Sequence, residues 1–264
     1  MDALLDRKDK DDFLGQFILI SDDQSPSDYF LHYFISQSIK DDYTVCLVSV
    51  NQSFDHYAAV ASKFSVNLRA SCSCFKFVKI SSYSTDTDVA TQAKQTEVSG
   101  PLDSTDTMTD QSSFCCYVER SVQELYELIK KLITTSSAGK PSCLIIDDIS
   151  VLLSIGISIK DLLIFVKYLI NLLQTKALSS LILRTHHDDD VEDEEERLLL
   201  TYLTHQSHLH LHTNGLKTGY SRDVHGEVTV ERRRPFLIQP QTHTMQYRNL
   251  DRSINIFSKG LSQV

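Results

Sequence analysis

The turn that follows the first apolar run decides whether this sequence can hold a nucleotide through a phosphate loop. It reads SDDQSPSD (21–28). A phosphate loop needs glycines that let backbone N–H groups approach the phosphates, together with a lysine and a Ser or Thr for Mg²⁺. This turn has no glycine and no lysine, and Pro26 removes one backbone donor. Asp22, Asp23 and Ser25 therefore mark a degenerate phosphate-loop position, where carboxylates take the place of phosphate near a helix start, and we expect no cofactor.

Asp147 is the second residue whose position suits nucleotide chemistry. It follows the apolar run 144–146, and an aspartate at the end of such a strand holds Mg²⁺ in nucleotide hydrolases. An aspartate there can also cap the next turn of the backbone. We favour the capping role, because the sequence offers Asp147 no partner lysine and no phosphate loop. The residue then marks a degenerate metal-binding position.

His208, His210 and His212 alternate with leucines, so a strand would place the three imidazoles on one face. Such a row could bind a metal ion. We favour a polar strand face, because no acid or cysteine stands at a matching spacing. The sequence also lacks a G-x-S-x-G nucleophile elbow, so a serine-hydrolase triad has no nucleophile. We therefore assign no catalytic residue and no metal ligand.

Charge is distributed unevenly along the chain. The formal net charge is −9, and eight acidic residues lie in one run at 188–196. We interpret this run as a solvated acidic loop, with an interaction surface as the alternative. The C-terminal region is locally basic, and its candidate RNA contacts are Lys217, Arg222, Arg232, Arg233 and Arg234. For the three consecutive arginines, pairing with acids at the end of a strand is an equally strong alternative.

The cysteine and hydropathy patterns indicate the cellular compartment of the protein. None of the six cysteines forms a C-x-x-C pair, which indicates reduced thiols in an intracellular protein. The N-terminus has no apolar stretch of the signal-peptide kind. The most apolar segment, 144–173, contains five charged residues and does not meet the requirement for a membrane span. We expect no contact with a membrane.

Short apolar runs alternate with segments of helical periodicity along most of the chain. Strands are expected at 17–20, 44–50, 75–80, 143–146, 180–183 and 208–212. Turn signals near the C-terminus separate short alternating runs, which indicates hairpins. The pattern predicts an α/β fold, with a mainly parallel central sheet flanked by helices and antiparallel C-terminal strands. We expect one domain over 1–264, with a flexible polar insertion at 81–113.

The helix expected after Ser158 carries its polar side chains on one narrow stripe. Most of the remaining circumference is apolar, which is wider than one sheet face requires. Such a helix is either deeply buried in its own domain or also packs on a partner subunit. Our interface candidates on this helix are Leu162, Phe165, Leu169 and Leu173.

Several strings, taken in order along the chain, resemble those of a known family. They are VCLV (45–48), QSF (52–54), HY (56–57), LIIDDISVLLSIG (144–156), HQSHL (205–209), GLKTG (215–219), RDVHG (222–226) and SKG (258–260). The ordered set resembles the animal members of the Elongator complex protein 6 family. The resemblance spans most of the chain and fails over 81–113, where this sequence carries its own polar insertion.

The resemblance implies a RecA-like ATPase fold that has lost its phosphate loop. It also implies assembly with Elongator subunits four and five, as a dimer of trimers, into a hetero-hexameric ring. That ring binds tRNA, releases it in association with ATP hydrolysis, and attaches to the catalytic Elongator subunits, which modify the wobble uridine of certain tRNAs. The phosphate-loop lysine and Ser/Thr have no counterpart here, so only Asp147 stands where a metal-directed carboxylate would lie. The implied location is the cytoplasm, with the nucleus as a second compartment.

Our principal hypothesis is a non-catalytic scaffold subunit that acts through its interfaces and supports a tRNA-modifying complex. The rival hypothesis is an active hydrolase. It would use Asp147 for nucleotide chemistry, or His208, His210 and His212 for metal-dependent chemistry. Stoichiometric zinc, or micromolar ATP binding by the isolated chain, would favour this rival.

Overall fold

The structure is a computed structural model that describes residues 13–23, 27–71, 73–81, 113–117, 122–136, 139–187, 193–216, 219, 221–233, 239–250 and 253–258. The strands are β1 (Gln16–Asp23), β2 (Thr44–Ser49), β3 (Phe75–Ser81), β4 (Ser113–Tyr117), β5 (Ser142–Ile146), β6 (Ser180–His186), β7 (Leu209–Asn214), β8 (Gly226–Arg232), β9 (Gln241–Asn249) and β10 (Ile254–Ser258). The helices are α1 (Asp28–Lys40), α2 (Phe54–Lys63), α3 (Gln123–Ser136), α4 (Val151–Ser154), α5 (Ile159–Gln174) and α6 (Glu194–Gln206), and Arg69–Ser71 form a 3-10 turn.

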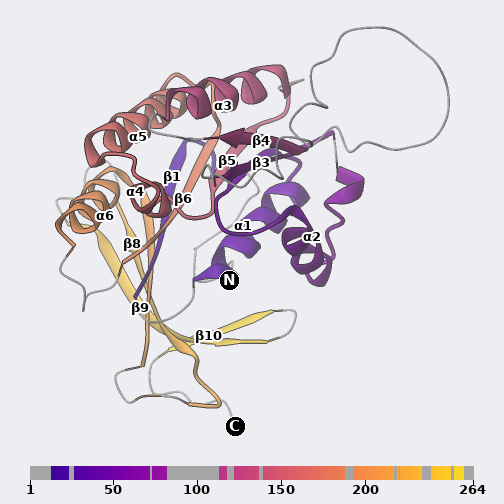
Figure 1. The fold of residues 1–264 in the computed structure, drawn as a ribbon. Helices are drawn as coiled ribbons and strands as arrows, with labels where there is room; N and C mark the ends of the chain where they lie inside the picture. Colours follow the sequence, from indigo (N-terminus) through magenta and orange to yellow (C-terminus); the bar gives the residue numbers. More distant parts are fainter. Residues whose placement is uncertain are drawn as a thin grey trace, which may run out of the picture.

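All these strands join one sheet, which has the order β10-β9-β8-β7-β1-β6-β5-β2-β3-β4 (Figure 1). Every neighbouring pair from β4 to β7 is parallel. The pairs from β7 to β10 are antiparallel. The structure therefore confirms the expected α/β fold, with a mainly parallel sheet and antiparallel strands at its C-terminal end.

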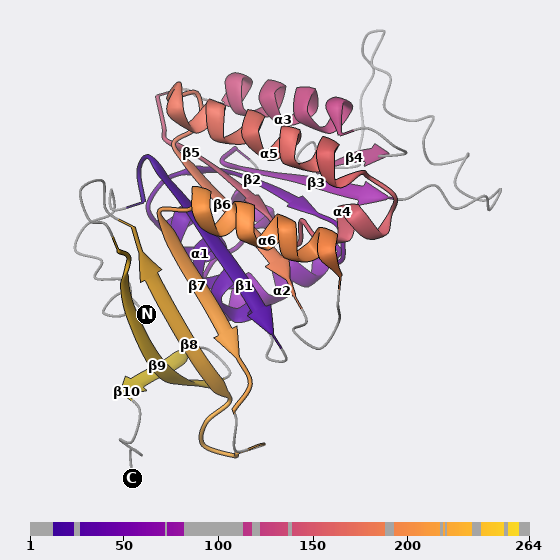
Figure 2. The ribbon, with the colours of Figure 1, turned by 90° about the vertical axis from the view of Figure 1, so that its left-hand side faces the viewer.

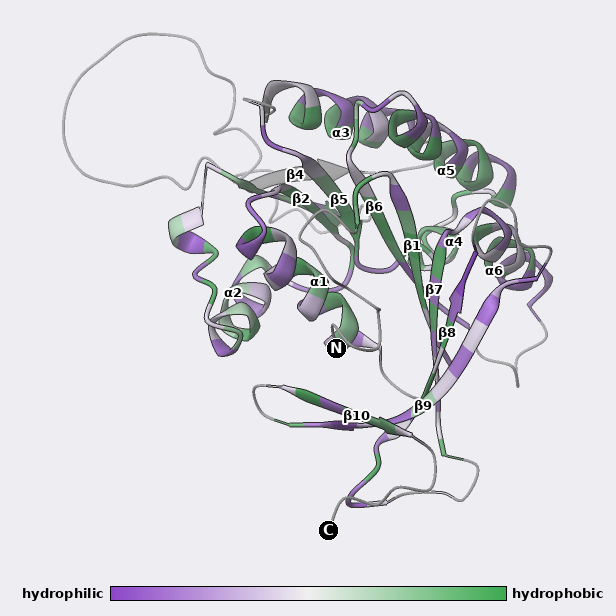
Figure 3. Ribbon diagram, turned by 180° about the vertical axis from the view of Figure 1, so that it is seen from behind, coloured by the Kyte–Doolittle hydropathy of each residue, from purple (hydrophilic) through white to green (hydrophobic). Residues whose placement is uncertain are grey.

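The central strands are apolar on both faces because helices cover both. In β1, Phe17 and Leu19 belong to one apolar cluster, whereas Ile18 and Ile20 belong to another. The first cluster includes residues of α3, α4, α5 and α6, and the second includes residues of α1 and α2 (Figure 2). Figure 3 shows the central strands as largely hydrophobic and the outer strand β9 as mostly hydrophilic. This two-sided burial explains why the central strands are continuous apolar runs in the sequence.

The segment expected as an insertion, 81–113, begins and ends within strands. Ser81 is the last residue of β3 and Ser113 is the first of β4, and the two strands pair in parallel. Residues 82–112 lie outside the described residues. The segment therefore connects two neighbouring strands at the edge of the sheet that is opposite to β10.

The acidic run at 188–196 is not a loop throughout, because its end starts a helix. The Asp193 carboxylate accepts hydrogen bonds from the backbone N–H groups of Glu195 and Glu196, at 2.9 and 3.1 Å. Acidic side chains at a helix N-terminus interact favourably with the helix dipole, by about 0.3–1 kcal/mol each. The last acidic residues of the run therefore cap and begin α6, which corrects the expected boundary. Residues 188–192 lie outside the described residues.

The structure also corrects the interface residues expected on α5. They are Leu162, Phe165, Leu169 and Leu173, and all four are buried in the apolar cluster beside the sheet. α5 lies between α3 and α6 and also contacts β1 and β6, so its own domain accounts for the wide apolar arc. The large apolar side chains that α5 exposes are Ile164 and Tyr168. No helix among the described residues is long and apolar enough to cross a membrane.

Candidate functional site

The carboxyl ends of the parallel strands meet at one edge of the sheet and form a small polar pocket. It has a volume of about 370 Å³, and its lining includes Tyr57, Asp147, Asp148, Arg184 and His186. In open α/β sheets, ligands bind in the crevice outside this edge. The two positions singled out in the sequence for nucleotide chemistry, Asp22 and Asp147, both contact Arg184 here.

Asp22 lies near the end of β1, and its carboxylate reaches the start of α1. The residue is only 2% exposed. Its Oδ2 accepts hydrogen bonds from the backbone N–H of Ser27, at 3.1 Å, and from the Ser27 hydroxyl, at 2.6 Å. Ser27 immediately precedes α1, so the carboxylate occupies the place where a phosphate loop would present a phosphate to the helix N-terminus. Asp23 follows on the other face of the strand, and Ser25 lies outside the described residues.

Arg184 on β6 neutralises this carboxylate. Its Nη2 lies 2.8 Å from Asp22 Oδ2 and 3.4 Å from Asp28 Oδ1, and its Nε donates to the Ser27 hydroxyl at 2.7 Å. Its Nη1 donates to the backbone carbonyl of Asp147 at 3.3 Å and lies 3.8 Å from Asp148 Oδ2. The side chain is 12% exposed. One buried guanidinium therefore joins β1, α1, β5 and β6.

Arg184 was missed in the sequence because the strand was expected to end at Leu183. The signal was a single cation that continues an apolar strand, SLILRTH (180–186). A charge in such a position requires a partner of opposite sign. The pair Asp147 and Asp148, at the end of the neighbouring strand β5, could have supplied that inference.

The pKa shifts follow from this network. Burial alone would raise the pKa of Asp22, but the Arg184 charge and the hydrogen bonds from Ser27, His186 and Arg184 outweigh it and lower the pKa. Burial alone would lower the pKa of His186, yet its 2.5 Å contact with Asp22 and the charge of that carboxylate raise it. Burial raises the pKa of Asp148, although Ser150 and Arg184 oppose the shift. The network therefore holds Asp22 ionised beside a protonated Arg184.

Both carboxylate oxygens of Asp147 accept hydrogen bonds from other groups of the protein. Its Oδ1 accepts from the backbone N–H of Val50 at 2.8 Å, and its Oδ2 accepts from the Ser49 hydroxyl at 2.6 Å and the Tyr57 hydroxyl at 2.7 Å. These bonds tie β5 to the end of β2 and to α2. Asp147 therefore does not cap the turn that follows it, which was the role we favoured from the sequence. Asp148 does, because its Oδ1 accepts from the backbone N–H and the hydroxyl of Ser150, at 3.2 and 2.6 Å.

The three histidines of the expected row connect β7 to β1. The Nδ1 of His208 accepts from the backbone N–H of Phe17 at 2.9 Å. The hydroxyl of Ser21 lies 2.7 Å from His210 Nε2 and 2.7 Å from His212 Nδ1. No three or more His, Cys, Asp or Glu side chains in the described part of the chain are grouped so as to hold a metal ion. The contacts observed at the row are structural.

Buried His210 is expected to make the protein less stable in acid. Burial, with the nearby charges of His212 and Arg233, lowers its pKa from 6.5 to about 3. Between these values the unfolded chain binds a proton that the folded chain excludes, so stability is full above pH 6.5 and falls as the pH drops. Between pH 6.5 and 5, His210 should account for a loss of about 2 kcal/mol in the free energy of unfolding.

Urea unfolding of the wild-type chain and of His210→Gln at the two pH values measures this loss. The amide of glutamine can still hydrogen-bond Ser21 but does not titrate. The variant should therefore lose less stability than the wild type in acid. An equal loss in both proteins would contradict the assignment.

The candidate RNA contacts do not form one cluster in the described residues. Arg222 is exposed and precedes β8, whereas Arg232 and Arg233 are half-buried at its other end. A seven-residue strand separates its ends by about 20 Å. The backbone N–H of Arg233 donates to the His208 carbonyl at 2.9 Å, so this part of the run is held against β7. Lys217 and Arg234 lie outside the described residues.

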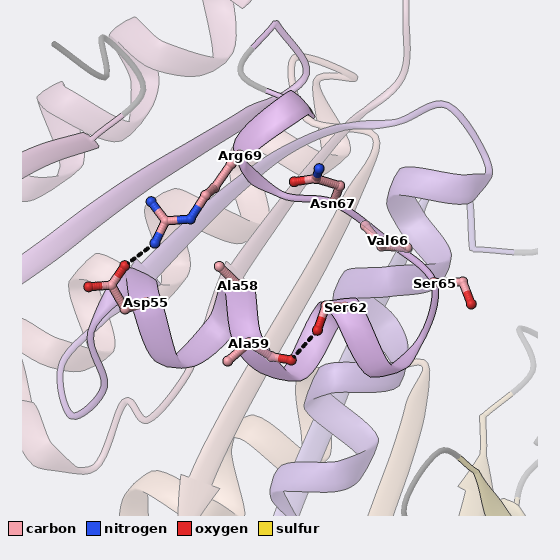
Figure 4. A pocket seen from close by; sticks show the side chains of 8 residues that line it. All are labelled: Asp55, Ala58, Ala59, Ser62, Ser65, Val66, Asn67 and Arg69. Atoms are coloured by element: carbon pink, nitrogen blue, oxygen red, sulfur yellow. Dashed lines mark hydrogen bonds and ion pairs between the residues drawn. The ribbon is translucent and has the colours of Figure 1, made fainter. Parts of the chain in front are cut away.

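A second, more open hollow of about 580 Å³ lies beside α2 (Figure 4). Its lining is mostly small side chains, and the charged residues Asp55 and Arg69 form an ion pair with each other. The Ser62 hydroxyl donates to the Ala59 carbonyl at 2.7 Å. These three polar side chains are therefore already partnered within the protein.

Comparison with known proteins gives one consistent family. The family model described as Elongation complex protein 6 matches residues 1–251. Elongator complex protein 6 of Homo sapiens is 31% identical over 258 residues, which cover 94% of this chain and 92% of that protein. The Xenopus laevis protein of the same name is 32% identical over 260 residues, with the same coverage.

Solved structures resemble the fold. An uncharacterised protein from Pyrococcus horikoshii, crystallised with an unknown peptide, aligns with a TM-score of 0.61 and 14% identity over 98% of this chain and 96% of that one. A KaiC-like protein from Pyrococcus horikoshii OT3 aligns with a TM-score of 0.56 and 10% identity over 92% of this chain and 90% of that one. The likeness confirms the RecA-like α/β architecture.

Proposed function

This chain belongs to the Elongator complex protein 6 family, which makes it an Elongator component, and we propose that it is a non-catalytic scaffold subunit. It joins Elongator subunits four and five in a hetero-hexameric RecA-like ring, a dimer of trimers. That ring binds tRNA, attaches to the catalytic Elongator subunits and supports modification of the wobble uridine. The complex acts in the cytoplasm and also in the nucleus.

The observation that carries the non-catalytic role is the carboxylate of Asp22 at the N-terminus of α1. It accepts from the backbone N–H and hydroxyl of Ser27, groups that a nucleotide phosphate would need, and it is paired with Arg184. A triphosphate at this position would have to displace an ionised carboxylate and break a buried ion pair. Asp147 supports the same conclusion, because both of its oxygens accept hydrogen bonds from the protein.

The rival hydrolase draws no support from the site. In the pocket the Ser150 hydroxyl and the Asp148 carboxylate are hydrogen-bonded to each other at 2.6 Å, and the histidine row is engaged with Ser21 and Phe17. The pocket thus favours a role in holding the fold, and the function is carried by surfaces that meet other subunits.

Co-expression with Elongator subunits four and five tests the proposal. The three chains should elute as one complex with the mass of a hetero-hexamer. The isolated chain should also give no micromolar signal when it is titrated with ATP. A stable monomer that ignores both subunits, or that binds ATP tightly, would overturn the proposal.

The same ring provides a test for RNA contact. Our candidate RNA contacts are Arg222, Arg232, Arg233, Lys217 and Arg234. Among those that the structure describes, Arg222 is the most exposed. Replacing Arg222 with Ala should weaken tRNA binding by a similar factor for different tRNAs and reduce the slope of log K against log salt by about one. Unchanged affinity in an intact ring would reject this residue.

A further inference from the structure

A groove between α3 and α5 carries the exposed apolar side chains of α5. The two helices contact each other on the outer layer of the molecule (Figure 2). The groove has a volume of about 480 Å³. Its apolar lining consists of Val122, Tyr126, Ile164, Phe165 and Tyr168. It lies apart from the polar pocket at the ends of the strands, with which it shares no lining residue.

Ile164 and Tyr168 are exposed to an unusual degree for large apolar residues that are one helical turn apart. Their exposed fractions are 41% and 52%. Residues spaced by four face the same side of a helix, so the two form one surface. The ring of Tyr168 also lies 5.4 Å from that of Tyr126 on α3. Single exposed apolar residues need no explanation, but a concave apolar surface edged by two tyrosines is typical of a protein-binding site.

The charged residues that line the groove are both acidic. They are Glu127 on α3 and Asp161 on α5. Lys130 lies over the ring of Tyr126, at 5.9 Å from its centroid, and is not part of the lining. A cation that enters the groove would therefore meet the carboxylates of Glu127 and Asp161 beside two tyrosine side chains, and the carboxylates attract positive charge.

From this complementarity we propose that the groove binds a segment of another Elongator subunit in which a Lys or Arg is flanked by aliphatic side chains. The aliphatic residues pack on Ile164 and the tyrosine rings, while the cation lies between Glu127 and Asp161. The inference rests on the proposed role in an Elongator assembly and specifies one surface of contact. A second copy of this chain is a poor occupant, because a twofold contact through the groove would bring like carboxylates together.

Binding of purified Elongator subunits to variants of the full-length chain tests the groove. Tyr168→Glu and Glu127→Lys should each weaken binding of one subunit about tenfold or more, because the first places a charge on the apolar surface and the second repels the incoming cation. Leu198→Glu is the matched control. Leu198 is 50% exposed on α6 and does not line the groove, so its replacement should leave the affinity unchanged.

A cross-link identifies the occupant. A chain that carries a benzophenone amino acid at position 168 should form a cross-link, in the assembled complex, to a segment of another subunit that contains Lys or Arg. A cross-link to a second copy, to a segment without a cation, or full-strength binding by both groove variants would overturn the inference. Failure of the unmodified chain to join any Elongator subunit would instead overturn the proposed function.

Discussion

Replacing Arg184 with Met is expected to lower the free energy of unfolding by about 3–5 kcal/mol, the usual effect of removing one partner from a buried ion pair. The guanidinium is 12% exposed and lies 2.8 Å from Asp22, whose own side chain is 2% exposed. Without it, the Asp22 carboxylate keeps its hydrogen bonds to Ser27 but loses its charge partner. Asp148 loses the same cation, which lies 3.8 Å away.

The ion pair between Lys140 and Asp42 is the matched control for this variant. It has the same N–O separation of 2.8 Å, but its side chains are 45% and 71% exposed. Lys140→Met should therefore leave the free energy of unfolding almost unchanged. Urea unfolding at pH 7 compares the two variants. An Arg184→Met protein as stable as Lys140→Met would show that the buried network does not hold the edge of the sheet together.

Adding Asp22→Asn to Arg184→Met should restore part of the lost stability, because the uncompensated charge is then removed. The sign of this coupling distinguishes a structural ion pair from a ligand site. If Asp22 and Arg184 served a ligand, their removal would change binding, and the stability of the unliganded chain would not depend on their pairing.

Periodicity was sufficient to predict the parallel strands β1, β2, β3, β5, β6 and β7 but not the edge strand β4, and long-range contacts explain further differences. The apolar runs at 17–20 and 143–146 mark strands because each is buried on both faces. The strand at 180–183 was predicted too short, because a pattern of apolar residues stops at Arg184 although the backbone pairing continues. The acidic start of α6 was missed for a related reason: a helix N-terminus favours carboxylates that composition alone assigns to a loop.

The candidate site was predicted in part. The positions of Asp22 and Asp147 followed from the rule that functional groups of α/β folds lie at the carboxyl ends of strands. The hydrogen-bond partners that determine the role of these two aspartates could not be predicted from the sequence, because Tyr57 and Arg184 come from distant parts of the chain. The same limit applies to α5, whose periodicity shows a wide apolar arc but does not show which part neighbouring helices cover.

Replacing Asp147 with Ala is expected to cost about 3–5 kcal/mol, whereas Asp147→Asn should cost about 1–2 kcal/mol. The carboxylate accepts from the Tyr57 hydroxyl, the Ser49 hydroxyl and the backbone N–H of Val50. Alanine leaves these donors without their carboxylate acceptor, and the Ser49 hydroxyl has a second acceptor within reach, the carbonyl of Gln52 at 2.7 Å. Asparagine keeps one oxygen for Val50, and its amide can donate to the hydroxyls.

Tyr57→Phe provides the internal check on this prediction. In the wild-type chain it removes a hydrogen bond to a buried charged group and should cost about 1.5–3 kcal/mol. In the Asp147→Ala chain the same change should cost little, because the tyrosine hydroxyl has already lost its acceptor. Additive effects in the urea unfolding of the single and double variants would show that Asp147 and Tyr57 act separately. An Asp147→Ala chain of unchanged stability that lost ATP or Mg²⁺ binding would identify Asp147 as a ligand-binding residue and favour the hydrolase over the scaffold.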